Sequence, residues 1–514
     1  MQGESRASSG AVWWAAAIPL AAVLALAHPT ARPFHSNQNQ YFAHAVGERT
    51  PSLTGDWLMG TDDPYPLFTW LAGGVLDLTG LSGIRVWSLA VTAAGVLAVG
   101  FVARALTTAR TAWPALLAMV VAAISLSPTL VAGAFPNAFQ GLAGQYVITG
   151  PGYVQPSSAG VALLFTLGLL LRYDEASGSR RRDLLVAAGG TAAIACAIHP
   201  TYAVVVVLGA AAAAVVDVTF RTTERMRAYA AVGIASVAAA VLANRSVLSL
   251  GSSVSGDTSL SRFAFERIPH HTLIAEWAWN EDGLVVLVIV AAAIAAPGVR
   301  HGTWLARWLG LGLAASLAAA GLVWASMWTS LALTFPWRIT VILMPLAVAV
   351  LSVRSGDLLE RSVSRRPRAV QSGLATVMVI LVGVSVVGLG RHGLELSRSA
   401  RDPSTTAPVS LVVEAAPEGV GLIPLTAENV RINARYPVFV DWKSPPYASA
   451  DLDEWWRRVD EVRAVAQDPS LLCARAWTQQ IEWILVPRSV EIPSCLREWS
   501  VARGDNGWRL LVEP

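Results

Sequence analysis

Three aspartates lie close together in one segment of the chain, GDWLMGTDDPYPLFTW, where they are Asp56, Asp62 and Asp63. An aspartate carboxylate can accept a proton from a hydroxyl group as a general base, and neighbouring carboxylates can bind a divalent cation. Aspartates before a proline are also common in solvated turns, where they accept hydrogen bonds from backbone amides. The spacing therefore predicts a catalytic carboxylate in this segment and leaves a turn as the alternative. No cofactor is identified, although a divalent cation would suit these oxygens.

Cationic side chains elsewhere suit the binding of a phosphate group. Arg338, in TFPWRIT, stands where an apolar run begins, and a guanidinium group can donate two parallel hydrogen bonds to phosphate. The alternative for Arg338 is a side chain that extends from a membrane helix to the surface. Arg267, His270 and His271 form a second such group, but neighbouring residues on a helix point in different directions, so a simple loop surface is the alternative there.

A third set of residues would suit the recognition of a sugar. Asn39 and Gln40 offer amide groups, and Tyr146 and Tyr153 offer aromatic faces within the glycine-rich segment 135–156. An aromatic belt at the membrane surface explains the tyrosines equally well. His199 precedes Pro200 between two apolar runs, where its ring could contact substrate or satisfy carbonyl groups that the proline leaves without a donor.

The composition determines which elements must position these residues. Of the 514 residues, 54% are hydrophobic and only 14% are charged, which excludes a simple soluble enzyme, a disordered chain and a nucleic-acid-binding tail. A membrane span needs roughly 17–25 apolar residues. The sequence therefore predicts an α-helical polytopic membrane protein, and the stretch 66–80 is short enough to be re-entrant or interfacial. About eleven spans are predicted, near residues 11–28, 84–103, 112–134, 157–171, 184–198, 200–218, 229–245, 283–298, 303–325, 337–353 and 371–390.

The arginines predict the orientation of these spans. Most arginines before residue 391 fall in alternate loops, and positively charged loops remain in the cytoplasm. This places the N-terminus inside and the first loop, residues 29–83, outside, together with 135–156, 246–282 and the C-terminal tail. The predicted location is thus a cytoplasmic (inner) membrane, with the candidate residues on its outer side.

The tail from residue 391 has a different composition, because charged residues return and strand-like and helix-like patterns alternate. Strands are predicted at 419–425, 437–442, 481–486 and 508–513, and helices at 426–435 and 451–466. We therefore expect two domains, a transmembrane domain over 1–390 and an extracytoplasmic α/β domain over 391–514. Cys473 and Cys495 both lie in this tail, where a disulfide and two unpaired buried thiols are both compatible with the sequence.

The order of motifs resembles the GT-C superfamily of polytopic membrane glycosyltransferases. Over roughly the first 200 residues, the likeness rests on motifs in the first outer loop and in the predicted helices after it. Over the rest of the chain it rests on the predicted topology. More narrowly, the chain is similar to a group of uncharacterised bacterial membrane proteins related to these enzymes. The segments concerned are NQNQYFAHAVGER (37–49), GDWLMG (55–60), DDPYPLFTWLAG (62–73), GLSGIRVWS (80–88) and the tail segment VFVDWKSPPY.

This resemblance implies a polyprenyl-phosphate-linked sugar as donor, an envelope glycan, lipid or protein as acceptor, and a catalytic aspartate or glutamate in the first outer loop. The chain departs from the pattern at Asn39 and Gln40, where many members have an acidic pair. An amide cannot accept the proton, so the base would be Asp62 or Asp63, with Asp56 next, or the protein does not catalyse.

The expected function is therefore sugar transfer from a polyprenyl-phosphate donor at the outer membrane face. A non-catalytic protein that binds or assembles lipid-linked glycans is the main alternative, because Asn39 and Gln40 replace carboxylates. A transporter is disfavoured, since the predicted spans contain almost no charge and no inverted repeat is evident.

Overall fold

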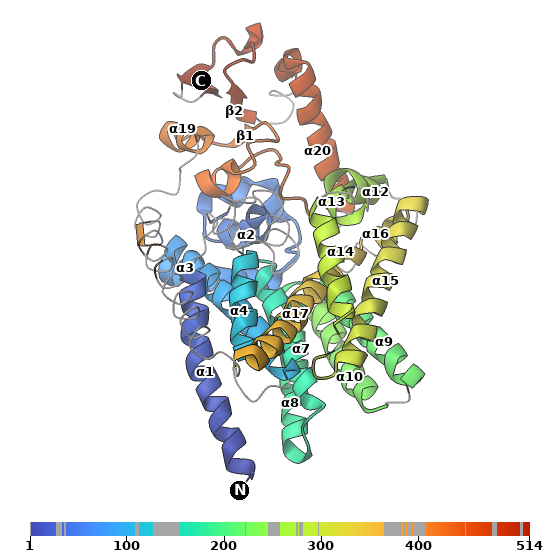
Figure 1. Ribbon diagram of the computed structural model, residues 1–514. Coiled ribbons are helices and arrows are strands. Elements are labelled where there is room, and N and C mark those ends of the chain that lie inside the picture. The colour runs from blue at the N-terminus through green and yellow to red at the C-terminus, as the bar shows by residue number, and fades with distance from the viewer. Residues whose placement is uncertain are drawn as a thin grey trace. The chain divides into compact units, whose positions relative to one another are not determined.

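The computed structural model in Figure 1 shows a mainly helical chain with a small C-terminal sheet. Two compact units divide the chain. Unit 1 comprises Met1–Ala31, Arg85–Ala243 and Phe263–Glu395, and unit 2 comprises Arg32–Ile84, Asn244–Arg262 and Leu396–Pro514. The structure describes residues 2–26, 33–34, 37–107, 113–126, 154–220, 223–244, 258–273, 276, 281–296, 298–363, 383, 387, 390, 393–394, 407–447, 449–474, 481–503 and 507–514.

Unit 1 consists of helices that arise from the long apolar runs. Its longer helices are α1 (Gln2–Leu26), the second part of α3 (Pro66–Leu106), α4 (Trp113–Leu126), α7 (Ser157–Tyr173), α8 (Gly178–Ile198), α9 (Tyr202–Phe220), α10 (Thr223–Ala243), α14 (Glu281–Ile294), α15 (Gly302–Ser326) and α17 (Thr340–Val363). Short turns follow α10 and α15, namely η4 (Phe263–Arg267), α13 (Pro269–Thr272), α16 (Thr329–Ala332) and η6 (Pro336–Ile339).

Within the described residues, four helices are long and apolar enough to cross a membrane: α3, α9, α10 and α15. Shorter apolar helices cover Val12–Leu26, Pro114–Ala123 and Ser157–Tyr173. These helices support a membrane protein. The predicted total of eleven spans and their orientation stay predictions, and the predicted span 371–390 lies largely outside the described residues.

Small residues allow the helices of unit 1 to pack closely. Helix α8 packs between α7 and α10 and buries Ala188, Ala192 and Ala195 completely. On α7, a Cβ atom at Gly168 would overlap the ring of Phe101 on α3, so only glycine permits this approach. Close backbone approach through small residues is the usual means by which membrane helices associate.

Helix α3 joins two segments that the sequence analysis separates, the stretch 66–80 and the span at 84–103. The 41-residue element is kinked at Gly80, whose φ of 62° and ψ of −150° are not helical. Glycine adopts a positive φ without the steric cost that a side chain would impose. The stretch 66–80 is therefore helical, and its depth in the membrane stays a prediction.

Unit 2 contains a four-stranded sheet in the order β1-β2-β4-β3. Strand β1 is parallel to β2, and β4 is antiparallel to both β2 and β3. Figure 1 shows β1 and β2 near α19 and α20 at the red end of the chain. The elements are α19 (Ala407–Ala415), β1 (Val420–Leu422), α20 (Ser449–Gln467), η8 (Pro469–Leu471), β2 (Ile481–Pro487), η9 (Ser494–Leu496), β3 (Ser500–Arg503) and β4 (Trp508–Val512).

The core of this sheet comes from the apolar residues that predict its strands. On the central strand, Trp483 and Leu485 are buried, and Leu510 of β4 packs with them. Val409 and Val412 of α19 complete the cluster. The disulfide between Cys473 and Cys495, with a Cα–Cα separation of 5.7 Å, resolves the two alternatives for these cysteines.

Two predictions for the tail are wrong in detail. The predicted helix 426–435 is a pair of turns followed by a π-helical turn, η7 (Arg431–Arg435), because the amides of Ala427 and Val430 donate three residues back instead of four. Within the part of the chain that the structure describes, the predicted strand 437–442 forms one bridge, between Val438 and Gly421, because the amide of Val438 bonds to the side chain of Asp56. Strand β3 was not predicted.

The first loop also belongs to unit 2. It forms α2 (Gln38–Gly47) and the 3-10 turns η1 (Pro51–Gly55) and η2 (Trp57–Gly60), and α12 (Thr258–Arg262) joins the same unit. Aromatic rings hold the loop together: the Phe42 and Phe68 rings lie 5.2 Å apart, and those of Tyr41 and Tyr65 lie 5.1 Å apart. The predicted division into domains 1–390 and 391–514 stays a prediction.

Candidate functional site

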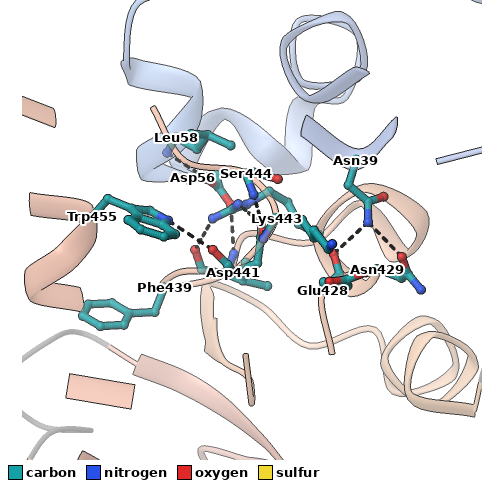
Figure 2. Close-up of polar contacts among 12 residues, drawn as sticks. Asn39, Asp56, Leu58, Glu428, Asn429, Phe439, Asp441, Lys443, Ser444 and Trp455 are labelled. Atoms are coloured by element: carbon teal, nitrogen blue, oxygen red, sulfur yellow. Dashed lines mark hydrogen bonds and ion pairs between the residues drawn. The ribbon is translucent and has the colours of Figure 1, made fainter. Parts of the chain in front are cut away.

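A buried ion-paired network links the first loop to the tail within unit 2 (Figure 2). The Nε atom of Arg431 donates to Oδ2 of Asp56 at 2.8 Å, and its second nitrogen pairs with Asp441. The third nitrogen of Arg431 donates to the carbonyl oxygen of Val438 at 3.2 Å. Asp56, Arg431 and Asp441 are 2%, 1% and 0% exposed. We refer to these three residues as the Asp56–Arg431–Asp441 network.

Backbone amides satisfy the remaining oxygens of this network. Asp56 precedes η2 and accepts from the amide of Leu58 at 2.9 Å, while its other oxygen accepts from Val438 at 2.9 Å. Asp441 accepts from the amides of Lys443 and Ser444, both at 2.7 Å. Figure 2 shows Asp441 between Trp455 and Ser444. Two carboxylates and one guanidinium group can remain buried because so many donors compensate the excess negative charge.

The ionisation of Arg431 reflects the same balance. Burial alone would lower the pKa of its guanidinium group, because it removes the charge from water. The nearby charges of Asp56 and Asp441 outweigh this effect and raise the pKa above its ordinary value. Arg431 is therefore a permanent cation, and both oxygens of Asp56 are already engaged in hydrogen bonds.

The two other aspartates of the first loop have different surroundings. Asp63 is half-buried, and its Oδ1 atom accepts a hydrogen bond from the amide of Tyr65 at 2.8 Å, as expected of a turn. Asp62 is exposed, and its carboxylate makes no hydrogen bond or ion pair with the part of the chain that the structure describes. Burial raises the pKa of Asp451, at the start of α20, and the charge of Asp62 raises it further. Asp62 therefore lies near enough to Asp451 for the two charges to interact.

His44 lies near these carboxylates at the end of α2. Burial lowers the pKa of His44, and the charges of Asp63 and Glu48 offset this only in part. Among the described residues, no group of three histidines, cysteines, aspartates or glutamates is arranged to hold a metal ion. The divalent cation accordingly stays a prediction.

Asn39 and Gln40 bond to the tail rather than lining an open surface. The buried amide of Asn39 donates to the carbonyl oxygen of Glu428 at 3.2 Å and to the side chain of Asn429 at 2.8 Å (Figure 2). The amide of Gln40 donates to the hydroxyl group of Tyr447. Both residues therefore help to join the first loop to the tail.

The remaining candidate residues belong to unit 1. Arg267 is buried in η4, and the half-buried ring of His271 lies 6.0 Å from that of Phe335. His199 is buried after α8, where its Nδ1 atom lies 3.1 Å from the hydroxyl group of Thr201 and its ring packs on Tyr202. Tyr146 and Tyr153 lie outside the described residues, as do the side chains of Arg338 and His270.

One connection in unit 2 has no counterpart in the sequence analysis. Arg262 of α12 donates two hydrogen bonds to Asp460 of α20, at 2.8 and 2.7 Å, and its guanidinium group lies 3.9 Å from the ring centre of Trp456. The indole of Trp456 donates to the carbonyl oxygen of Ser259 at 3.0 Å. In the sequence, the residue types arginine and tryptophan are the only indication that such a contact can form.

Comparisons with known proteins give limited matches. Residues 414–462 match a family described as "Domain of unknown function (DUF6798)". No curated protein matches the chain. Among solved structures, the chain is similar to the oligosaccharyltransferase AglB of the archaeon Archaeoglobus fulgidus, solved with an inhibitory peptide and a dolichol-phosphate. The TM-score is 0.42 at 12% identity, over 93% of this chain and 69% of AglB.

Proposed function

We propose that this protein is a membrane glycosyltransferase of the GT-C type, which transfers a sugar from a polyprenyl-phosphate donor to an envelope acceptor at the outer membrane face. The observation that carries the proposal is the contrast among the three aspartates of the first loop. Asp56 is buried and fully engaged, and Asp63 accepts a hydrogen bond from a backbone amide. Asp62 keeps an exposed carboxylate on the segment that Asp56 holds in place.

In this proposal Asp62 is the general base. The oxygen of an acceptor hydroxyl group attacks the anomeric carbon of the donor sugar, and the bond between that carbon and the phosphate oxygen breaks. The hydroxyl proton passes to the carboxylate of Asp62, and the bonding electrons leave with the polyprenyl phosphate. Positioned general bases typically accelerate such steps by about 10²- to 10⁴-fold.

Other residues have supporting roles in this proposal. Arg338 binds the phosphate of the donor, because a guanidinium group stabilises the negative charge that the leaving phosphate gains. The Asp56–Arg431–Asp441 network fixes η2, which ends two residues before Asp62. Such support matters because a displacement of about 1 Å at a catalytic group can reduce the rate by roughly 100-fold.

A transfer assay tests the proposal. Membranes that contain the protein are given a polyprenyl-phosphate sugar labelled in the sugar, and the appearance of labelled glycan, lipid or protein is measured. We expect transfer by the wild type and by Asp453→Asn, a matched exposed aspartate of α20, and its loss in Asp62→Asn. Arg338→Gln should also lose transfer. Full transfer by Asp62→Asn would contradict the proposed base.

The second candidate is a non-catalytic protein that binds or assembles lipid-linked glycans. The contacts of Asn39 and Gln40 favour it, because these residues replace an acidic pair and bond to the tail instead. This candidate predicts that a polyprenyl-phosphate-linked glycan remains bound through purification, that no transfer occurs, and that Asp62→Asn does not change the amount bound. Turnover by the wild type would exclude it.

A further inference from the structure

Three arginines gather near the ends of apolar helices of unit 1, and none of them belongs to the residues of the proposed transferase. Arg104 is two residues from the end of α3, Arg172 is one residue from the end of α7, and Arg300 is two residues before the start of α15. We refer to them as the arginine cluster. Arginines at the ends of membrane helices commonly extend to the level where lipid headgroups meet the hydrocarbon of a bilayer.

Contacts between α3, α7 and the residues before α15 bring these three arginines together. The guanidinium group of Arg172 lies 4.4 Å from the ring centre of Phe101, one helical turn before Arg104 on α3. The backbone amide of Arg300 donates to the carbonyl oxygen of Leu106, two residues after Arg104, at 2.8 Å. Arg104 lies close enough to both Arg172 and Arg300 for their charges to repel.

Nearby carboxylates do not neutralise the cluster. Glu175 accepts from Arg300 at 2.6 Å and lies 3.4 Å from His301. The neighbouring Asp174 pairs with Arg225 at 3.1 Å, so it too has a partner. Three guanidinium groups and the one carboxylate of Glu175 leave two positive charges in excess.

Arg104 and Arg172 therefore form the accessible part of the cluster. Both side chains are half-buried, and within the described residues neither makes a hydrogen bond or ion pair. Their nitrogen atoms are not among the buried polar atoms of the described chain, so an external group can reach them. A partly buried cation without an anionic partner is costly, and a bound anion would remove that cost.

We propose that Arg104, Arg172 and Arg300 form a binding site for the phosphate of an anionic membrane lipid. Guanidinium groups bind phosphate oxygens through paired hydrogen bonds, and basic pockets between membrane helices bind anionic headgroups. This site is independent of the proposed transferase residues.

The experiment uses the full-length protein, stripped of lipid in detergent. Phosphatidylglycerol or phosphatidylcholine is added in mixed micelles, and lipid bound to the protein is counted by native mass spectrometry. We expect the wild type to prefer phosphatidylglycerol by about tenfold or more, since one charged hydrogen bond changes affinity by about that factor. Arg227→Gln, which removes an exposed arginine of α10, should keep this preference. The double variant Arg104→Gln/Arg172→Gln should lose it.

An unchanged preference in the double variant would overturn the proposal. Equal binding of both lipids by the wild type would also overturn the proposal. This result needs no variant, so it can be obtained even if the double variant does not fold. Competition with inorganic phosphate distinguishes a lipid from a soluble phosphate as the ligand. If inorganic phosphate does not displace phosphatidylglycerol, the result supports a lipid site. If it displaces phosphatidylglycerol at equal concentration, the site binds a soluble phosphate and the lipid proposal is overturned.

Discussion

Arg431 and Asp56 form a buried ion pair across 375 residues of sequence, with the Nε atom of the arginine 2.8 Å from Oδ2 of the aspartate. This pair fixes the first loop on the tail within unit 2, and Asp441 completes it from the other side. It also distinguishes Asp56 from Asp62. Both residues are loop aspartates of the same motif, but the first is structural and the second is exposed.

The Asp56→Asn variant should destabilise the protein by about 3 kcal/mol, because breaking a buried pair leaves part of a buried charge without compensation. Thermal unfolding of the purified protein in detergent measures this. Asp453→Asn, at an exposed position of α20, should change the stability by less than about 0.5 kcal/mol. Equal stability of the two variants would contradict a structural role for Asp56.

Replacing Arg431 should change how the stability of the protein depends on pH. In Arg431→Met, two neighbouring buried carboxylates remain, and their repulsion should raise the pKa of at least one of them in the folded state. A raised carboxyl pKa means that the folded state binds the proton more tightly, so the stability of the variant should fall as the pH rises from about 4 to 7. Melting temperatures over this range test the prediction. A variant whose pH dependence matches that of the wild type would contradict it.

His44 should make the wild type sensitive to acid. Burial lowers the pKa of His44 in the folded state below its ordinary value of 6.5, so the unfolded state binds the proton more readily. The stability should accordingly fall as the pH decreases below about 6.5. His44→Gln should reduce this fall, and the difference between the two melting curves isolates the contribution of His44. Parallel curves would contradict the prediction.

The disulfide between Cys473 and Cys495 closes a loop with a sequence separation of 22 residues. Constraint of such a loop in the unfolded chain stabilises a protein by about 3 kcal/mol. The variant Cys473→Ser/Cys495→Ser should therefore unfold at a lower temperature, and a reducing agent should lower the melting temperature of the wild type but not that of the variant. Free thiols at both positions in the untreated protein, detected by mass spectrometry, would contradict the pairing.

The sequence predicted those elements whose pattern is local. The segments 451–466, 481–486 and 508–513 emerge as α20, β2 and β4 with small changes at their ends, because their apolar spacing matches one element type. The segments 426–435 and 437–442 were predicted incorrectly, because distant partners determine their conformation. The amide of Val438 donates to Asp56, and Arg431 forms an ion pair with the same aspartate. Neither contact can be recognised from the residue pattern of the segment itself.

The same limit applies to the candidate site. Residue types indicate that Asp56, Asp62 and Asp63 can all serve as bases. The environments of Asp56 and Asp62 differ through residues that are remote in sequence, such as Arg431 for Asp56 and Asp451 for Asp62. The contacts of Asn39 and Gln40 with the tail also depend on remote residues, Asn429 and Tyr447.

The most direct test of the proposed transferase is the turnover number for sugar transfer from a polyprenyl-phosphate sugar by Asp62→Asn, compared with Asp453→Asn. We predict a decrease of about 100-fold or more in Asp62→Asn, with normal folding and unchanged retention of the donor lipid, since only the proton acceptor is removed. Turnover by Asp62→Asn within about twofold of the Asp453→Asn control would contradict the role of Asp62.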